Sequence, residues 1–287
     1  MPIFLGISIA CIQESIQYVV YTYCTKTGEE PMVSDVFQDE SKNALSMSEI
    51  YTILRQDILT LKITPGALLS ENQVSTRFNT SRTPIRNVFA HLAREGLVTV
   101  HPKKGTYVSL IDLDLAAQII FMRTQVEYAV MSHIASNPDA QLFKALEENL
   151  QMQQEQIRQG VNDEEFYFID SQFHGLCMRS MRKTKLWEMI QRMDVHYSRY
   201  RRLDYKATRQ KHVFETLLKE HKQLYQYMKN GEPAKLKYAL TAHLYGGFFR
   251  INTRFETEYP ELLTKNGKSV EDLLLEIKVL LNEAQKG

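Results

Sequence analysis

Apolar residues repeat every three or four positions after Ser46, which predicts a first helix. Ser46 and Glu49 form a capping box at its start. Two more helical segments follow, one that begins at Ser70 and one that begins near residue 81. A tight break at Asn79-Thr80 separates the second helix from the third. The apolar positions of the first helix are Ile50, Leu54, Ile58 and Leu61.

Two β-prone runs follow the third helix, which ends at Gly96. They cover 97–100 and 106–110, and the intervening residues 101–105 read as a hairpin turn. Three helices and a hairpin, with a tight turn between the second and third helices, predict a winged helix-turn-helix over 47–110. Such a domain places its third helix in the major groove of DNA.

From Asp112 onward the pattern is helical throughout, with about six helices separated by short breaks. This predicts an all-α bundle over 111–255, with ligand sites between facing helices. One more amphipathic stretch predicts a helical tail over 256–287. The fold class is therefore mainly α. Residues 1–46 are interpreted as a poorly ordered extension to which we assign no function, with Met32 and Met47 as alternative starts.

Charge is distributed unevenly along the chain. The 287 residues carry 35 Lys and Arg and 34 Asp and Glu, so the whole chain is nearly neutral. Residues 47–110, however, hold eight basic and four acidic residues, whereas 1–46 hold two and six. A local basic module is typical of a modest DNA-binding domain, although a solvated basic face has the same count.

Two features bear on the compartment. The three cysteines, Cys11, Cys24 and Cys177, are widely spaced and odd in number, which argues against a disulfide framework and favours a reducing cytoplasm. The apolar run from Ile3 to Ile12 is too short for a membrane span, which needs roughly 18 apolar residues. We therefore expect a cytoplasmic protein with no membrane partner.

The third predicted helix and the hairpin carry the candidate DNA contacts. Arg82 and Arg86 are four residues apart and share one helix face, from which Arg grips a guanine edge or a phosphate. Ser81, Thr83 and the free N–H groups of the first turn suit phosphate oxygens. The alternative is a small helical domain with surface arginines. On the hairpin the candidates are His101, Lys103, Lys104 and Gly105.

The same residues carry a family resemblance. The run Ser81-Arg82-Thr83-Pro84-Ile85-Arg86, followed by Glu95-Gly96-Leu97-Val98 and Gly105-Thr106-Tyr107-Val108, resembles the GntR family of bacterial transcriptional regulators. The resemblance implies that Ser81, Arg82, Thr83 and Arg86 contact an operator, with the wing near His101 and Gly105. Asn79 replaces the family's usual turn glycine, and Asn tolerates the left-handed conformation. Asn72 replaces an Arg that the family usually has, which removes one expected contact.

Four residues of the bundle suggest a metal site. Asp170 and His174 are four apart and share a helix face, whereas His221 and His243 lie at nearly equal distances on either side of the turn at 230–233. In an antiparallel helical hairpin these side chains converge. One carboxylate and three imidazoles suit Zn²⁺, Ni²⁺ or Mn²⁺, and an octahedral ion keeps two positions open for a carboxylate or hydroxy acid. The alternative is a set of hydrogen-bonded core residues.

The bundle also carries a resemblance. Asp170-x-x-Phe173-His174, Glu220-His221 and His243-Leu244 resemble the FCD ligand-binding domain of the FadR subgroup of GntR regulators. In that family the Asp and three His hold a metal, and small organic acids bind beside it. The resemblance then makes Arg123, in the motif Arg123-x-x-Val126-Glu127, the candidate partner of an effector carboxylate. The alternative for Arg123 is a structural ion pair with an acidic neighbour.

These observations predict a transcriptional regulator and no enzyme. We expect a homodimer on a pseudo-palindromic double-stranded operator, with a divalent metal and a small carboxylic acid as effector in the bundle. Three alternatives stay open: a metal-dependent enzyme of the helical-bundle type, a pure metal sensor, and a regulator whose bundle has lost its metal. The fused DNA-binding module argues against the enzyme.

Overall fold

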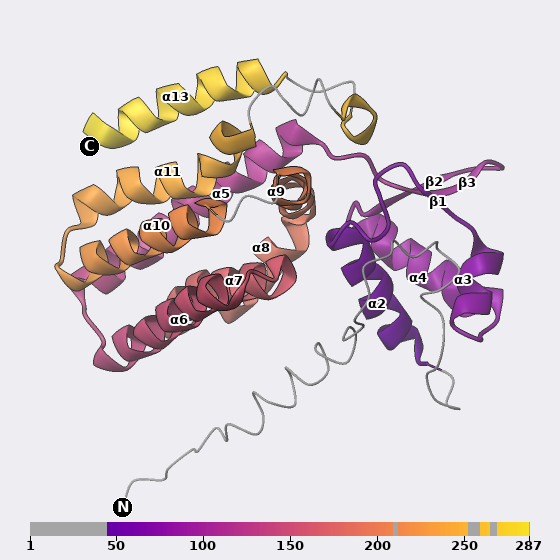
Figure 1. Ribbon diagram of the computed structural model, residues 1–287, viewed down its shortest axis with the longest axis horizontal. Helices are drawn as coiled ribbons and strands as arrows, with labels where there is room; N and C mark the ends of the chain where they lie inside the picture. The colour runs from indigo at the N-terminus through magenta and orange to yellow at the C-terminus, as the bar shows by residue number, and fades with distance from the viewer. Residues whose placement is uncertain (1–44, 209–211, 252–258, 265–268, 287) are drawn as a thin grey trace, which may run out of the picture. The chain divides into compact units, whose positions relative to one another are not determined.

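The computed structural model describes residues 45–208, 212–251, 259–264 and 269–286. The extension predicted for 1–46 lies outside the described residues except for its last two positions, and so do parts of the predicted tail. The described elements form an N-terminal region of short helices with a small sheet, followed by a bundle of longer helices (Figure 1). The predicted mainly α fold is confirmed.

The N-terminal region contains three helices and three short strands, as predicted except for one additional strand. In chain order they are α2 (Met47–Leu59), β1 (Leu68–Leu69), α3 (Glu71–Arg77), α4 (Arg82–Arg94), β2 (Val98–His101) and β3 (Gly105–Val108). The antiparallel sheet has the order β1-β3-β2, and His101 pairs with Gly105 at the hairpin turn. The sequence pattern did not reveal β1 because two residues are too few to establish a period.

Local chemistry explains where these helices begin. Ser46 and Glu49 form the predicted capping box at the start of α2. Ser70 caps α3 by accepting a hydrogen bond from the amide of Gln73. Ser81 occupies the N-cap position of α4 but makes no capping hydrogen bond through its side chain. Its hydroxyl is therefore not used by the helix itself.

The C-terminal region is a helical bundle with one shared apolar core, as expected. Its elements are α5 (Leu113–Ser136), α6 (Ala140–Gln159), α7 (Asp163–Ser180), α8 (Thr184–Met193), α9 (Val195–Thr208), α10 (His212–Lys229), α11 (Pro233–Ile251), the 3-10 turn η1 (Pro260–Leu262) and α13 (Val270–Lys286). α6 packs between α7 and α10, and α11 packs against α5, α10 and α13. The sequence pattern suggests a helix break over 203–208, but α9 is continuous through these residues to Thr208, so that prediction is wrong.

The last helix belongs to the same core. Val270, Leu273 and Ile277 are buried with the apolar residues of the bundle. Leu275 and Val279 are exposed on the other side of α13. The amphipathic stretch near the C-terminus is therefore a packing helix of the bundle.

Candidate metal centre and DNA interface

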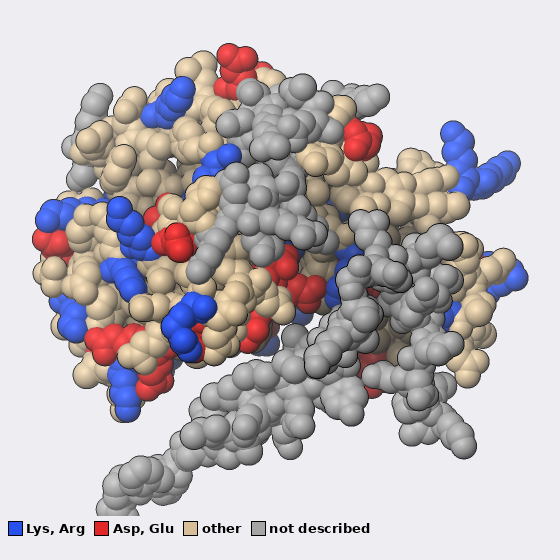
Figure 2. All heavy atoms as spheres, viewed as in Figure 1, with Lys and Arg blue, Asp and Glu red and all other residues tan. Residues whose placement is uncertain are grey.

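All eight residues predicted to contact DNA are exposed in the structure. On the helix they lie at the N-cap and in the first two turns of α4, and on the hairpin they run from the last residue of β2 to the first residue of β3. Figure 2 shows basic side chains extending from the tip of this hairpin. Exposure permits the predicted contacts, which stay a prediction. The exposed residues are Ser81, Arg82, Thr83, Arg86, His101, Lys103, Lys104 and Gly105.

Three backbone positions with positive φ shape this surface. Asn79, between α3 and α4, has φ +45°, the left-handed conformation expected for the residue that replaces a turn glycine. Lys103 at the hairpin turn has φ +64°, and Gly105, two residues further along the chain, has φ +122°. Arg86 donates from Nε to the Glu71 carboxylate at 2.9 Å, although its side chain remains 64% exposed. Glu71 therefore orients Arg86 without removing it from solvent.

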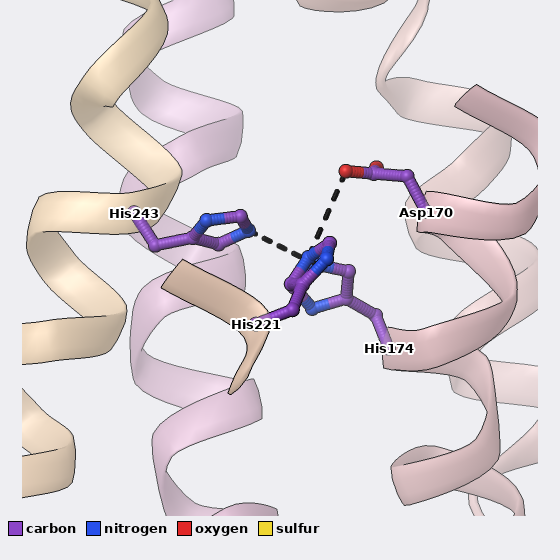
Figure 3. A group of neighbouring side chains, drawn as sticks. All are labelled: Asp170, His174, His221 and His243. Carbon is purple, nitrogen blue, oxygen red and sulfur yellow. Dashed lines mark hydrogen bonds and ion pairs between the residues drawn. The ribbon is translucent and has the colours of Figure 1, made fainter. Parts of the chain in front are cut away.

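The four candidate metal ligands come together in the interior of the bundle. Asp170 and His174 project from α7, His221 from α10 and His243 from α11 (Figure 3). One ligand atom from each lies within 4.8 Å of the others, and all four residues are buried. The convergence predicted from helix periodicity and from the turn at 230–233 is therefore present in the fold.

Each histidine is held through its Nδ1 atom by a different residue. Nδ1 of His174 is 2.5 Å from Glu127, and Nδ1 of His243 is 2.8 Å from Glu220. A carboxylate only accepts hydrogen bonds, so both Nδ1 atoms carry the proton and both Nε2 atoms are left with a lone pair. The tautomers are thus assigned by the hydrogen-bond network.

The third histidine is oriented by an amide. Nδ1 of His221 lies 2.8 Å from Oε1 of Gln153. Gln153 donates its own N–H to Asn149 at 2.7 Å, and Asn149 donates to the Ile169 carbonyl at 2.9 Å. This chain fixes which end of the Gln153 amide faces the ring, so Nδ1 of His221 is also the protonated nitrogen.

Three lone pairs therefore point at one place. Nε2 of His174 lies 3.3 Å from Nε2 of His221 and 3.2 Å from Nε2 of His243. Two nitrogens that bind the same ion, each at about 2.0–2.1 Å, lie about 3.0–3.4 Å from each other. The Asp170 Oδ1 atom is 3.7 Å from Nε2 of His221. The donor set and its spacing fit one divalent first-row ion.

Burial and the charged groups around the cluster shift the pKa values of its side chains in the directions that favour binding of a cation. Burial, the largest single influence, would raise the pKa of Asp170, but Arg201 and the neighbouring histidines together outweigh it and hold that pKa far below its usual range. Burial lowers the pKa of His221. Burial also lowers the pKa of His243, although Glu220 opposes that shift. Burial opposes ionisation of Glu127, yet Arg123 and His174 lower its pKa to about 2. These shifts keep Asp170 and Glu127 charged and favour the neutral form of His221 and His243.

A small pocket adjoins the cluster. It is lined by Arg123, Tyr197 and Arg201 together with His174, His243 and two leucines, and these side chains leave no room for a water molecule between them. Arg123 is 4% exposed and donates from Nε to Glu127 at 2.7 Å, while Nη1 lies 3.4 Å from Asp194. The structural ion pair considered for Arg123 is therefore present, and the same residue also lines the pocket.

Several residues of the site were not found from the sequence. Glu127 and Glu220 lie inside the quoted motifs, but nothing in the pattern showed that they would hold histidine rings. Gln153 lies on a different helix, and no local pattern identifies it. Arg201 belongs to the run Arg199-Tyr200-Arg201-Arg202, which resembles a solvated basic face although Arg199 is completely buried.

The winged helix-turn-helix and the helical bundle together define a DNA-binding regulator with a fused all-α domain. Residues 47–108 match the family described as bacterial regulatory proteins, gntR family, and residues 118–246 match the FCD domain. The chain belongs to the GntR family and is a DNA-binding transcriptional regulator of the GntR/FCD type. The resemblance inferred from the motifs is confirmed.

Individual relatives agree with this assignment. A protein of Streptomyces ambofaciens described as an uncharacterized HTH-type transcriptional regulator in unstable DNA locus is 33% identical over 77% of this chain and 91% of its own length. The HTH-type transcriptional repressor RspR of Escherichia coli is 33% identical over 68% of this chain and 84% of its own length.

A solved structure shares the fold. Escherichia coli McbR/YncC superposes with a TM-score of 0.61 at 17% identity, covering 74% of this chain and 99% of that one. At this identity the likeness concerns the fold alone. Among the described residues, no helix is both long and apolar enough to cross a membrane.

Proposed function

We propose that this protein regulates transcription in response to a small carboxylic acid, which binds beside a divalent metal in the helical bundle. The observation that carries the proposal is the convergence of three imidazole lone pairs and a carboxylate, with each ring fixed by its own Nδ1 partner. Neutral nitrogens with facing lone pairs repel one another, and a cation between them turns that repulsion into coordination.

Asp170, His174, His221 and His243 would hold the ion, with Zn²⁺, Ni²⁺ and Mn²⁺ as the candidates. When bound, the ion supplies positive charge and open coordination positions for a carboxylate. The protein's own contribution is a buried pocket with the guanidinium groups of Arg123 and Arg201 beside the histidines. Guanidinium pairs with carboxylate through two parallel hydrogen bonds, which favours an acid as effector.

The DNA-binding side of the proposal follows from the winged helix-turn-helix. A homodimer would place two α4 helices on a pseudo-palindromic operator, because domains of this type read two half-sites one helical turn apart. Effector binding in the bundle would change operator affinity by a coupling free energy of about 1–3 kcal/mol. Relief of repression by the acid is the expected direction.

The first experiment is the metal content of the purified, unchelated protein, measured by elemental analysis. We expect about one divalent ion per chain in the wild type and a loss of that ion in His174→Ala. His133→Ala is the matched control, because His133 is an exposed histidine of the same bundle. No metal in the wild type, or equal metal in His174→Ala, would remove the ion from the proposal.

A second measurement separates the alternatives. Operator binding is followed by fluorescence anisotropy with metal-free protein, with metal-loaded protein, and with metal-loaded protein plus small carboxylic acids. Release by the acid only in the presence of metal supports the proposal. Release by the metal alone would identify a pure metal sensor, and turnover of an added acid would favour the metal-dependent enzyme.

A further inference from the structure

Arg201 of α9 forms an ion pair with the carboxylate of Asp170, one of the four candidate metal ligands. Its Nη2 lies 3.2 Å from Oδ1 of Asp170 and its Nη1 lies 3.3 Å from Oδ2. Both side chains are nearly buried, with 14% of Arg201 and 5% of Asp170 exposed. The guanidinium also lies over the ring of Tyr167 at 4.5 Å and of Tyr197 at 5.7 Å. These rings hold the cation in place independently of Asp170.

Arg201 and a metal ion would use the same oxygen atom. Oδ1, which Nη2 of Arg201 contacts, is the Asp170 oxygen that faces Nε2 of His221 at 3.7 Å. Charge-assisted N–H···O bonds are usually about 2.7–2.9 Å long, so the contact between Arg201 and Asp170 is loose. A divalent ion at Oδ1 therefore competes with Nη2, while Nη1 can stay on the other oxygen.

Arg123 is not expected to exchange its carboxylate partner when a metal binds. Its Nε bond to Glu127 is 2.7 Å long, and Glu127 is not among the four candidate ligands. Glu127 also contacts Nδ1 of His174, so a metal bound at Nε2 of that ring leaves the ion pair between Glu127 and Arg123 in place. Of the two arginines that line the pocket, only Arg201 shares an atom with the metal site.

Resting on the proposed metal and effector site, we propose that Arg201 is an exchangeable counter-ion. In the metal-free protein it neutralises Asp170, and on metal binding it gives up Oδ1 and turns the freed N–H toward the carboxylate of the effector. The ion brings two positive charges to a pocket where Asp170 was already paired with Arg201, so an anion is needed to balance them. Metal binding then precedes acid binding.

The single tryptophan of the chain provides the readout. The Trp187 ring is stacked at 6.2 Å on the ring of His174, so its emission reports events at the cluster. Metal-free full-length protein is titrated with Ni²⁺ alone, which quenches nearby indole emission, in the presence of a competing chelator. The Ni²⁺-loaded protein is then titrated with acetate, the simplest carboxylate.

Three variants test the exchange. Arg201→Gln removes the competing cation and is expected to bind Ni²⁺ at least about tenfold more tightly and acetate at least about tenfold more weakly. Arg201→Lys keeps the charge but not the two parallel hydrogen bonds, so its Ni²⁺ affinity should lie between those of the wild type and Arg201→Gln. Arg202→Gln is the matched control, because Arg202 also lies over Tyr167, at 5.1 Å, and bonds the Ser198 carbonyl.

The outcomes are distinguishable. Unchanged or weaker Ni²⁺ binding by Arg201→Gln would show that Arg201 supports Asp170 as a positioning residue, and would overturn the exchange. Equal acetate binding with and without Ni²⁺ would overturn the order of binding. Failure of the wild type to bind Ni²⁺ would overturn the proposed metal site itself. If Arg201→Gln does not fold, as judged by circular dichroism, Arg201→Lys decides: Ni²⁺ affinity at or below that of the wild type overturns the exchange.

Discussion

Gln153 accepts a hydrogen bond from Nδ1 of His221 across 2.8 Å, although the two residues are 68 positions apart in the chain. This contact determines which nitrogen of the ring faces the cluster. Gln153→Leu leaves Nδ1 of His221 without its buried partner and frees the ring to adopt either tautomer. Loss of such an outer partner typically weakens metal binding about 10–100-fold.

The measurement for Gln153→Leu is Zn²⁺ affinity by competition with a chromophoric chelator. Gln154→Leu is the matched control, since Gln154 is the exposed next residue and contacts Lys222 instead of the cluster. An affinity of Gln153→Leu within twofold of the control would mean that the amide does not orient His221 for a metal.

Two adjacent glycines of α11 are expected to respond in opposite ways to alanine. A Cβ at Gly247 would lie 2.6 Å from the hydroxyl of Tyr197, which is buried and donates to the Leu244 carbonyl at 2.6 Å. Because the ring has no room to yield, Gly247→Ala should destabilise the protein by about 1–3 kcal/mol. It should also disturb the pocket, which Tyr197 lines.

Gly246→Ala is the comparison. There the added Cβ meets the end of the Arg250 side chain at 2.7 Å, and a guanidinium on a flexible stem can move. The gain in helix propensity then dominates and is worth up to about 1 kcal/mol. Urea unfolding of both variants tests the contrast, and equal changes in their free energies of unfolding would contradict the assigned role of Gly247.

The sequence predicted the winged helix-turn-helix and the four candidate ligands because their determinants are periodic. Asp170 and His174 share a helix face at a spacing of four, and His221 and His243 are related by a turn that the sequence marks. Gln153 and Arg201 could not be found in this way. They reach the cluster from α6 and α9, and the packing angles that bring them there depend on the whole core.

The glycine pair shows the same limit. Two adjacent glycines, Gly246 and Gly247, are unusual inside a helix, since glycine weakens helices. For Gly247 the reason lies outside α11, in the Tyr197 hydroxyl that approaches the backbone of this helix from α9. Burial of Arg199 could not be predicted either, because two of its partners are the backbone carbonyls of Ser109 and Val195, which no side-chain pattern records.

Stability should fall as the pH drops below neutrality, partly through His196. Nδ1 of His196 accepts hydrogen bonds from the amide of Asp112 and from Arg199, so the ring is neutral in the fold. Burial, together with Arg199, lowers the pKa of His196 to about 4 from its ordinary 6.5. The unfolded chain takes up the proton first, so the stabilisation is complete above about pH 6.5 and is lost toward pH 4.

The expected loss from His196 is up to about 3 kcal/mol. His196→Gln keeps an acceptor for both donors and cannot titrate. Urea unfolding at pH 7.5 and pH 5 should therefore give a smaller drop for His196→Gln than for the wild type. His221 and His243 contribute to the drop in both proteins, so the difference between the two isolates His196. Equal drops would show that His196 does not carry the effect.

Arg82 and Lys103 should affect DNA binding in different ways. Arg82 is exposed in the first turn of α4, the part of a recognition helix that meets base edges, so Arg82→Ala should cost about 1–3 kcal/mol and relax base preference. Lys103 is exposed on the hairpin turn, so Lys103→Ala should weaken binding to every sequence alike and reduce the salt slope by about 0.9.

Both effects can be measured by anisotropy on operator and scrambled duplexes over a range of salt concentrations. Lys144→Ala serves as the control, because Lys144 is an exposed lysine of α6 in the bundle and leaves the α4 and hairpin surface unchanged. If Arg82→Ala loses affinity for the operator but not for the scrambled duplex, and Lys103→Ala loses affinity equally for both duplexes, base reading is assigned to α4 and backbone contact to the wing. Identical behaviour of the two variants would reject that division, because a phosphate contact and a base contact differ in both sequence dependence and salt dependence.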